Sequence, residues 1–290
     1  MHDQKRVAAI HDISCLGKCS LTVALPVISA MGIEVSAIPT AILSTHTGGF
    51  TDYTFRDLTD DILPIARHWR GLHVRFDAIY TGYLGSFRQV GLVLETFDAL
   101  KSPETLIVVD PVMADNGRLY AHFPPDFPSG MRKLCAAADL IIPNLTEAAL
   151  LLDEPYVEGP YAMGYVEGLL ARLAALGPRM VILTGVWFDE NALGAACLDA
   201  ATGRVSVRLA PREPGYYHGT GDLFASAVTG ALTGGFDLDR AVGLAVDFTA
   251  GAIRRTRDAG TDPRFGVNFE AELGALAEAV SGSRRNPELS

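Results

Sequence analysis

The sequence predicts an α/β fold, with a central, mostly parallel sheet, helices on both faces in three αβα layers, and an antiparallel hairpin at the edge. Short apolar runs alternate with longer stretches of helical periodicity, which is typical of βαβ units. Polar or glycine residues follow most of these runs, as they do at the ligand-binding edge of such a sheet. The rhythm changes after Gly185, where two strand-like runs follow each other directly.

The alternation of strands and helices occupies the first two thirds of the chain. Strands are expected at the short apolar runs, at residues 6–11, 34–40, 77–80, 106–109, 140–142 and 180–183. Helices are expected where apolar residues recur every three or four positions, at residues 18–31, 60–69 and 89–100. Strands that are separated by helices in this way form a parallel sheet.

The last third of the chain is predicted to begin with the hairpin, whose strands are expected at 191–197 and 204–209. A loop rich in Pro and Gly follows at 211–221, and then two apolar helices, at about 222–233 and 238–255. The polar tail at 281–290 is expected to be frayed. Because no repeat or low-complexity linker divides the chain, we expect residues 1–290 to form a single domain.

Composition and charge exclude several classes of protein. Of 290 residues, 49% are hydrophobic and 20% charged, whereas disordered proteins combine low hydrophobicity with high charge. The chain has 24 basic and 34 acidic residues and a formal charge of -10. Nucleic acids and anionic membranes bind basic surfaces, so neither is expected as a partner.

No targeting or membrane signal is evident in the sequence. Residues 1–6 are polar, no apolar signal region follows them, and no apolar run reaches the ~20 residues of a membrane span. None of the four cysteines belongs to a CxxC pair, as expected for thiols in a reducing compartment. We therefore expect a cytoplasmic protein, and the sequence leaves the roles of Cys15 and Cys19 open.

The sharpest motif is Gly219-Thr220-Gly221-Asp222, at the start of a predicted helix. Its glycines let the backbone approach a ligand closely, and the helix N-terminus presents free N–H groups with a partial positive charge. These features predict an anion site built without a lysine. Asp222 can accept the proton of a hydroxyl group that attacks phosphorus. The alternative is a glycine turn in which Thr220 or Asp222 only caps the helix.

Two further motifs place carboxylates at predicted strand ends. Glu147 can hold Mg²⁺ through water, although Asn144 followed three residues later by Glu is also the pattern of a capping box. Asp110 follows the strand at 106–109, and the loop at 115–120 then crosses the expected ligand face. For this segment the alternative is an ordinary turn, which Asp-Asn-Gly favours.

Two loops carry aromatic candidates. His46 lies in the polar loop at 44–52 and is predicted as a ligand contact or proton carrier, with an ordinary surface histidine as the alternative. Tyr83 follows the strand at 77–80 and can line a flat aromatic substrate, with a core tyrosine as the alternative.

The segment Gly17-Lys18 superficially suggests a P-loop. The required earlier glycine is absent because residue 12 is Asp, and the residue after Lys18 is Cys rather than Ser or Thr. No GxGxxG dinucleotide motif follows the first strand either. Both classical nucleotide motifs are therefore excluded.

Taken in order, the motifs resemble those of the ribokinase-like superfamily of small-molecule kinases, and within it the pyridoxal/pyridoxamine kinases. The matching segments are THTGG at 45–49, TGYLGS at 81–86, DPVM at 110–113, NGRLY at 116–120, PNLTE at 143–147, LTG at 183–185 and GTGD at 219–222. The resemblance extends from about residue 6 to 255. It implies a homodimer that phosphorylates the 5′-hydroxymethyl group of a vitamin B6 vitamer with ATP, in B6 salvage.

The resemblance also implies roles for individual residues. Asp222 would be the general base, and Gly219, Thr220 and Gly221 would form the anion hole. Mg²⁺ would be held by Glu147 and Asp110, with Tyr120 on the phosphate or metal side, and the family allows for a monovalent cation. The residues implied in ATP binding are Asp110, Asn144, Glu147, Thr184, Gly219 and Gly221. Those implied in substrate binding are Asp12, His46, Tyr83 and Asp222.

The sequence departs from the family pattern in three places. Asp12 stands where many pyridoxal kinases have Ser, and related hydroxymethylpyrimidine kinases carry Asp near this point. Ile142 stands where some relatives have Thr, and the loop at 12–20 is shorter than in many relatives. The alternatives are a hydroxymethylpyrimidine kinase of thiamine biosynthesis, a sugar or nucleoside kinase, and a non-catalytic vitamer-binding protein. The preferred vitamer stays open.

Overall fold

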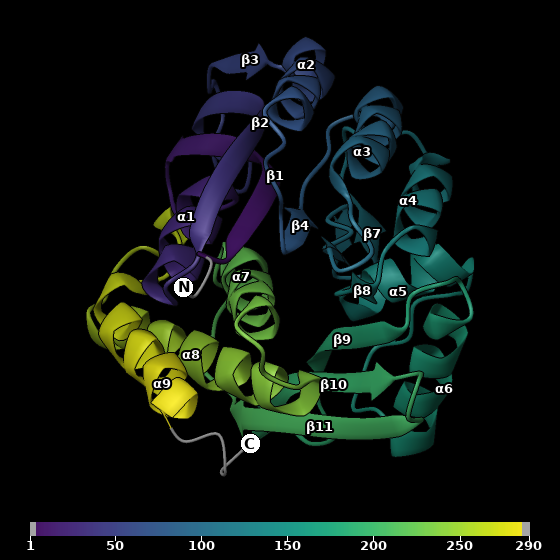
Figure 1. Ribbon diagram of the computed structural model, residues 1–290. Coiled ribbons are helices and arrows are strands. Elements are labelled where there is room, and N and C mark those ends of the chain that lie inside the picture. Colours follow the sequence, from purple (N-terminus) through teal and green to yellow (C-terminus); the bar gives the residue numbers. More distant parts are fainter. Residues whose placement is uncertain (1–3, 286–290) are drawn as a thin grey trace.

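A nine-stranded sheet forms the middle of the protein, in a computed structural model that describes residues 4–285 (Figure 1). The strands of this sheet are β1 (Arg6–Leu16), β2 (Glu34–Thr45), β3 (Phe55–Asp57), β4 (Ala78–Thr81), β5 (Leu106–Val109), β8 (Leu140–Ile141), β9 (Met180–Val186), β10 (Ala192–Asp199) and β11 (Arg204–Pro211). They lie in the order β11-β10-β9-β8-β5-β4-β1-β2-β3. From β9 to β2 the pairing is parallel, whereas β3, β10 and β11 pair antiparallel.

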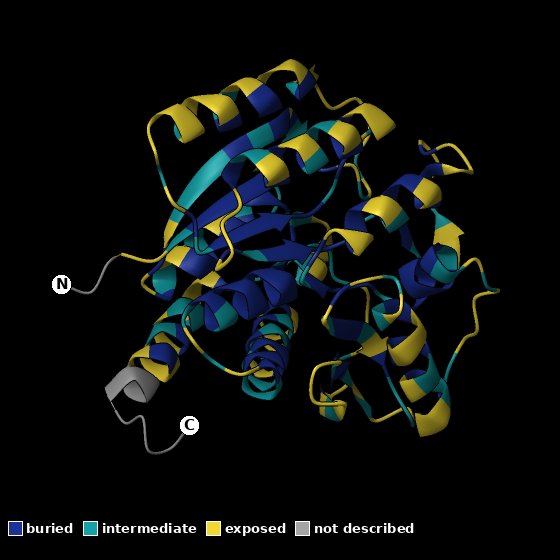
Figure 2. Cartoon of the chain, turned by 45° about the vertical axis from the view of Figure 1, so that its right-hand side comes forward, coloured by how far each residue is buried: buried dark blue, intermediate teal, exposed yellow. Residues whose placement is uncertain are grey.

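Helices cover both faces of this sheet. The helices are α1 (Leu21–Ala30), α2 (Thr59–Gly71), α3 (Phe87–Leu100), α4 (Phe127–Ala136), α5 (Leu145–Leu152), α6 (Met163–Ala174), α7 (Thr220–Thr233), α8 (Leu238–Asp258) and α9 (Leu273–Arg285), with short 3-10 turns η1 (Pro263–Phe265) and η2 (Glu270–Glu272). Helices α2 to α6 share one apolar core with the sheet, and α1, α7, α8 and α9 share the other. In Figure 2 the central strands are buried, and the outer sides of the surrounding helices are exposed. The predicted fold class is therefore confirmed, including the hairpin of β10 and β11 at the edge.

The strand order reverses at β1, which pairs with β2 on one side and with β4 on the other. In open α/β sheets ligands bind beyond the carboxyl ends of the strands at such a switch point. A separate small hairpin of β6 (Ala114–Asp115) and β7 (Arg118–Leu119) follows the carboxyl end of β5. The topology thus directs the candidate residues at the strand ends toward one region.

Several boundaries differ from the sequence prediction. Strands β1 and β2 were predicted to end at residues 11 and 40, but they continue in parallel pairing to Leu16 and Thr45. Their register shifts between His11 and Ile13, which lets the longer strands stay paired past a bulge. Strand β3, the hairpin of β6 and β7, and helices α4, α6 and α9 were not predicted.

The predicted frayed tail is partly wrong. Residues 281–285 belong to the last turns of α9, because the apolar side chains of Leu276 and Val280 anchor this helix in the core. The rest of the predicted tail, 286–290, lies outside the described residues. Within residues 4–285, none of the helices is apolar and long enough to cross a membrane. The single domain over 1–290 stays a prediction.

Candidate active site

The predicted anion loop lies at the N-terminus of α7. Gly219 is the N-cap residue with φ 76°, a left-handed conformation that favours glycine, and a Cβ there would overlap the carbonyl oxygen of Lys18. The Thr220 hydroxyl donates to the carbonyl of Tyr217 at 3.1 Å, and no side chain caps the helix. The alternative of a Thr220 or Asp222 cap is therefore wrong. The N–H groups of the first turn stay available for an anion.

Asp222 lies in the first turn of α7 and is partly buried. Burial raises the pKa of this carboxyl to about 7, although a hydrogen bond from the backbone N–H of Ser20 opposes the shift; the nearby Asp12 raises it further. A carboxyl with a pKa near neutrality is suited to take a proton at physiological pH. Asp222 thus combines the position and the proton affinity of a general base.

Two buried carboxyl groups lie close to each other, Asp110 directly after β5 and Glu147 in the first turn of α5. Only 5% and 3% of these residues are exposed. Burial raises the pKa of Asp110, and the charges of Glu147 and Asp222 raise it further. Burial likewise raises the pKa of Glu147 to about 8. Carboxyl groups with raised pKa values gain most from a cation that binds between them.

The capping box predicted as the alternative for Asn144 and Glu147 is confirmed. The Asn144 side chain accepts from the N–H of Glu147, and Glu147 Oε2 accepts from the N–H of Asn144, both at 2.9 Å. Glu147 Oε1 accepts from the N–H of Met113 at 3.1 Å. Capping does not exclude a metal role, since each carboxylate oxygen has a second lone pair.

Among residues 4–285, no group of three or more His, Cys, Asp and Glu side chains is arranged to hold a metal ion. Mg²⁺ is commonly bound by one or two carboxylates together with water and substrate phosphates. The buried pair of Asp110 and Glu147 fits this incomplete kind of site. It does not fit a site that the protein alone completes.

The loop between β5 and α4 is held against the start of α5. Asn144 Nδ2 donates to the carbonyl of Ala114, and the N–H of Gly117 donates to the Thr146 hydroxyl, both at 2.9 Å. In the same loop, burial and Glu147 raise the pKa of Tyr120, so its phenol stays protonated and can donate a hydrogen bond. Thr184 of β9 forms a bridge to Asn144, which places it beside this loop.

Asp12 lies in the second half of β1, near Asp222 of α7, and His46 directly follows β2. The N–H of Gly48 donates to His46 Nδ1 at 3.1 Å, so Nε2 carries the proton and donates to the carbonyl of Arg264 at 2.6 Å. Both ring nitrogens are thus engaged, and the residue is only 7% exposed, with its ring beside those of Phe50 and His218, so the alternative of an ordinary surface histidine is wrong. Asp12 accepts from the Ser14 hydroxyl at 3.1 Å, and burial raises its pKa.

Tyr83 is only partly buried, and its hydroxyl is hydrogen-bonded to His122 Nε2 at 2.8 Å at the surface, so it is not a tyrosine of the sealed core. Burial raises the pKa of Tyr83, and the charge of Asp12 raises it further, which places these two side chains within electrostatic reach. The rings of Tyr83 and His122 lie 5.7 Å apart. The role of Asp12 and Tyr83 in substrate binding stays a prediction.

Three residues near the site were missed in the sequence. The His218 ring lies 5.1 Å from that of His46 and 5.0 Å from that of Tyr216, whose hydroxyl donates to Asp115 at 2.7 Å. Burial, then Asp222 and Asp12, raise the pKa of Cys19, so its thiol stays protonated. Two of these residues could have been found from their neighbours in the sequence. His218 directly precedes Gly219 of the anion loop, and Cys19 directly follows Lys18, the lysine of the rejected P-loop.

The exclusion of a P-loop is confirmed. Lys18 Nζ bonds to Asn268 at 3.1 Å and to Glu270 at 2.9 Å, so the lysine is turned away from the strand ends. Cys15 is exposed, and all four cysteines, which lie in the described part of the chain, are free.

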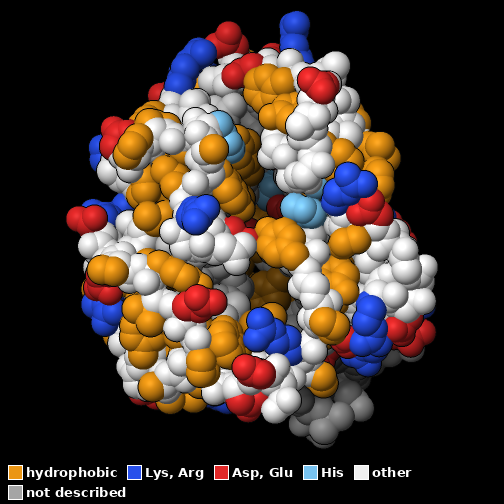
Figure 3. Space-filling model, turned by 180° about the vertical axis from the view of Figure 1, so that it is seen from behind, with side chains coloured by type: hydrophobic (Ala, Val, Ile, Leu, Met, Phe, Trp, Pro, Cys, Tyr) orange, Lys and Arg blue, Asp and Glu red, His pale blue; other side chains and the backbone are white. Residues whose placement is uncertain are grey.

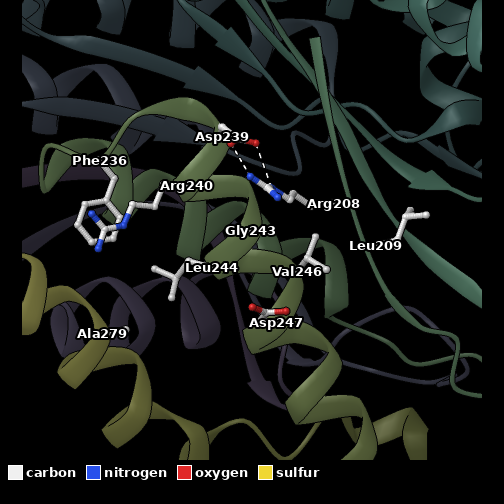
Figure 4. Close-up of a pocket in the computed structure, with 10 residues that line it drawn as sticks. All are labelled: Arg208, Leu209, Phe236, Asp239, Arg240, Gly243, Leu244, Val246, Asp247 and Ala279. Atoms are coloured by element: carbon white, nitrogen blue, oxygen red, sulfur yellow. Dashed lines mark hydrogen bonds and ion pairs between the residues drawn. The ribbon is translucent and has the colours of Figure 1, made fainter. Parts of the chain in front are cut away.

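A pocket elsewhere on the surface is not the candidate site. It lies between β11 and α8, has a volume of about 490 Å³, and contains Arg208 hydrogen-bonded to Asp239 at 3.0 Å (Figure 4). Its charged pair is already satisfied, and no strand of the parallel part ends there. On the face in Figure 3, histidine, acidic and apolar side chains border a recess instead.

The comparison with known families decides the class of this protein. The family model described as phosphomethylpyrimidine kinase matches residues 25–265. The chain belongs to the phosphomethylpyrimidine kinase family. Its structural neighbours include a pyridoxal kinase, a protein of ribokinase-like fold, which matches the resemblance inferred from the motifs.

Three relatives in this family share most of their length with the chain. A Bacteroides thetaiotaomicron structure, provisionally assigned as a phosphomethylpyrimidine kinase and crystallised with pyridoxal, is 41% identical with a TM-score of 0.89, over 94% of this chain and 96% of its own. Pyridoxal kinase from Lactobacillus plantarum is 35% identical with a TM-score of 0.86, over 96% and 98%. Pyridoxal kinase from Arabidopsis thaliana is 29% identical over 99% and 93%.

Proposed function

We propose that this protein is an ATP-dependent kinase that phosphorylates the 5′-hydroxymethyl group of pyridoxal, pyridoxamine or pyridoxine in vitamin B6 salvage. The observation that carries the proposal is Asp222, a carboxyl with a pKa of about 7 in the first turn of a helix whose N-terminus is uncapped. The names of the relatives from Lactobacillus plantarum and Arabidopsis thaliana support the choice of substrate.

Proton transfer and charge stabilisation come from the same helix terminus. Asp222 accepts the proton of the substrate hydroxyl as the hydroxyl oxygen attacks the γ-phosphorus of ATP in line, and the bond from this phosphorus to the β–γ bridging oxygen breaks, with ADP as the leaving group. Backbone N–H groups of Gly219, Thr220 and Gly221 stabilise the negative charge that develops on the phosphoryl oxygens. Because these donors are fixed by the start of α7, they need no rearrangement during the reaction.

The nucleotide is proposed to lie along the carboxyl ends of β5, β8 and β9, where Asp110, Asn144, Glu147 and Thr184 gather. Asp110 and Glu147 would hold Mg²⁺, which when bound offsets the charge of phosphates beside carboxylates. The protonated phenol of Tyr120 would donate a hydrogen bond to a phosphate oxygen. A monovalent cation remains part of this proposal only as an expectation from the family.

The substrate ring is proposed to lie between His46 and Tyr83, with its hydroxymethyl group toward Asp222. The ring nitrogens of His46 are engaged with the backbone, so its contribution is the flat face of the imidazole. Asp12 would contact the ring nitrogen or a ring substituent. These residues supply orientation, which lowers the barrier by holding the hydroxyl near the phosphorus.

The direct test of this function is ATP-dependent product formation on pyridoxal, pyridoxamine, pyridoxine and hydroxymethylpyrimidine, read by mass. We expect each accepted vitamer to gain one phosphoryl group, with the highest kcat/KM for a vitamer. A higher kcat/KM for hydroxymethylpyrimidine would reject the proposed substrate but not the reaction. Vitamer binding without ATP consumption would reject the reaction.

Hydroxymethylpyrimidine kinase is the second candidate because Asp12 is the residue that related hydroxymethylpyrimidine kinases carry near this point. The description of the matching family model favours the same alternative. The substrate panel separates the two candidates. A sugar or nucleoside kinase is disfavoured by the aromatic side chains His46 and Tyr83, which suit a flat ring better than a polyol.

The hydrogen bond between Tyr83 and His122 leads to a prediction about substrate affinity. Tyr83→Phe and His122→Phe each remove this bond, and we expect each to weaken vitamer binding about 3-fold to 10-fold, with the KM for ATP unchanged. The double variant should be no weaker than the single ones, because both act through one bond. Fluorescence titration measures the Kd.

Tyr165→Phe is the matched control for this prediction, since Tyr165 lies on α6 and stacks on Tyr161 with ring centres 5.8 Å apart. Its vitamer affinity should equal that of the wild type. Additive effects of Tyr83→Phe and His122→Phe would show that the two side chains contact the substrate independently.

The predicted homodimer and cytoplasmic location belong to the same proposal. Apolar side chains are exposed along β1, β2 and β3, where Leu16 is 56%, Ile42 39% and Phe55 55% exposed. We expect light scattering to give about twice the chain mass of 31.0 kDa. A dimer that persists unchanged in Phe55→Ser would contradict an interface at this edge, and a monomeric wild type would reject the homodimer.

A further inference from the structure

A group of buried polar atoms without direct partners lies between the sheet and α7. Among the described residues, seven buried side-chain nitrogen and oxygen atoms make no hydrogen bond, and four of them belong to His11, Tyr80 and Ser226. All three residues are 0% exposed. Buried polar groups are nearly always hydrogen-bonded to protein or ordered water, so such a concentration needs an explanation.

The three side chains come from different elements but face the same layer. In β4, Ala78 and Tyr80 belong to the core shared with α7, whereas Ile79 belongs to the opposite core, as strand alternation requires. The rings of His11 and Tyr80 meet edge to face, with centres 4.4 Å apart. Gly82 leaves room for His11, because a Cβ there would lie 2.7 Å from the imidazole ring.

Ser226 differs from the other hydroxyl residues of α7. Thr229 and Thr233 both donate to the carbonyl four residues earlier, at 2.7 Å, whereas the Ser226 hydroxyl does not. Ser226 lies one helical turn after Asp222, so it is on the same side of the helix. Its hydroxyl therefore stays available to a partner beneath the general base.

The pKa shift of Tyr80 reflects its burial and also the charges of two carboxylates of the candidate site, Asp110 and Asp222. Burial raises the pKa of Tyr80, and Asp110 and Asp222 raise it further, while the Ser226 hydroxyl opposes the shift, because it lies within hydrogen-bonding reach of the Tyr80 hydroxyl although the two do not form a bond of normal geometry. Burial lowers the pKa of His11 to about 3, so the imidazole is neutral, with one nitrogen donating and the other accepting. The group thus offers both donors and acceptors and no net charge.

We propose that His11, Tyr80 and Ser226 form a binding site for ordered water, and that this hydrated cluster positions Asp222 at the start of α7. A buried water molecule binds where two to four polar partners converge, and it can donate and accept at the same time. Water also satisfies a mixed set of neutral partners, whereas a metal ion would prefer anionic ligands. The three residues are positioning residues, because they act through α7 rather than on the substrate.

This inference rests on the proposed function for its role in catalysis, but the water site itself can be tested without substrate. A crystal structure of the protein alone, at about 1.5 Å resolution, should show water within about 2.6–3.2 Å of the Tyr80 hydroxyl and of His11 or Ser226. The same structure of Tyr80→Phe should lose or displace that water. A dry cluster, with the three side chains bonded directly to each other, would overturn the proposal.

Turnover tests the positioning role. Tyr80→Phe and Ser226→Ala remove single hydroxyl groups, and we expect each to lower kcat roughly tenfold while the Kd of the vitamer stays within about twofold. The double variant should lose less than the product of the two effects, because both hydroxyls hold the same water. A change in KM with kcat preserved, or full kcat in both variants, would refute the role of the cluster.

Thr249→Val is the matched control, since Thr249 of α8 also carries a buried hydroxyl without a direct partner but lies outside the cluster. It should keep the wild-type kcat even where its Tm falls as much as that of Tyr80→Phe. Equal losses of kcat in all variants would show a general structural effect. If the wild type phosphorylates no vitamer, the proposed function fails while the water experiment still decides the site.

Discussion

Asp222→Asn is expected to lower the kcat of vitamer phosphorylation by about 10²-fold to 10⁴-fold, with the Kd of ATP within about twofold of the wild type. Asn has nearly the same shape and still accepts the N–H of Ser20, but it cannot take a proton from the substrate hydroxyl. The anion hole is made of backbone groups and stays in place. Rapid-quench measurement of a single turnover isolates the chemical step from product release.

The same substitution should stabilise the fold at higher pH. The folded-state pKa of Asp222, about 7, lies above its ordinary value of 3.8, so the folded protein binds this proton more tightly than the unfolded chain. The stability that this group contributes is therefore present below pH 3.8 and is lost as the pH rises through 7. Asp222→Asn should have a higher Tm than the wild type at pH 8, and an equal Tm near pH 3.5.

Asp61→Asn is the control for both effects, because Asp61 is an exposed acid in the first turn of α2. It should leave kcat at the wild-type value and should not raise the Tm at pH 8 as Asp222→Asn does. Near-normal turnover of Asp222→Asn would reject Asp222 as the base. Lower stability of Asp222→Asn at pH 8 would instead indicate that the carboxylate makes favourable contacts that outweigh its burial.

The sequence predicted the sheet well because parallel strands are buried on both faces and form continuous apolar runs. Strand β5, for example, has the bounds that the sequence predicted, 106–109. Strand β1 was predicted to end at residue 11, where the apolar run stops, and the polar residues Asp12 and Ser14 follow. Here the tertiary pairing with β2 continues past a bulge, and the polar side chains are buried in the site.

The candidate site was predicted only where function leaves a local pattern. Gly219 and Asp222 stand in a loop-to-helix motif whose chemistry is readable from residue types alone. Tyr80 and His11 look like ordinary strand residues, and their role depends on which face of the sheet they occupy. His218 is a candidate only because the folded chain brings the loop at 211–221 beside His46. The positions of such side chains in the site depend on contacts between segments that are distant in the sequence, and no local pattern encodes these contacts.

Removal of divalent metal is expected to abolish turnover, because the proposed site places carboxylates beside the phosphates of ATP. Both groups are negatively charged, so a cation is needed between them. Asp12, Asp110, Glu147 and Asp222 all have raised pKa values, so each already resists a negative charge. The protein as a whole carries a formal charge of -10. Excess EDTA should therefore reduce activity to background and also weaken ATP binding, as measured by calorimetry, and added Mg²⁺ should restore both.

The fold should not depend on this metal, since the buried carboxyl of Glu147 is held by backbone groups. Glu147 accepts from Met113 and Asn144 whether or not a cation is present, so the Tm without nucleotide should be the same in EDTA and in Mg²⁺. Loss of structure in EDTA would mean that a metal supports the fold itself. Undiminished turnover in EDTA would contradict the metal requirement.

A substitution then separates the contribution of Glu147 from that of the nucleotide phosphates. Glu147→Gln keeps a carbonyl oxygen for the capping box but removes the charge, so half-maximal activity should require about tenfold more Mg²⁺, with maximal kcat partly retained. Glu167→Gln, at an exposed position of α6, is the control and should leave the requirement unchanged. An unchanged requirement in Glu147→Gln would remove Glu147 from the metal ligands and leave its cap of α5 as its only role.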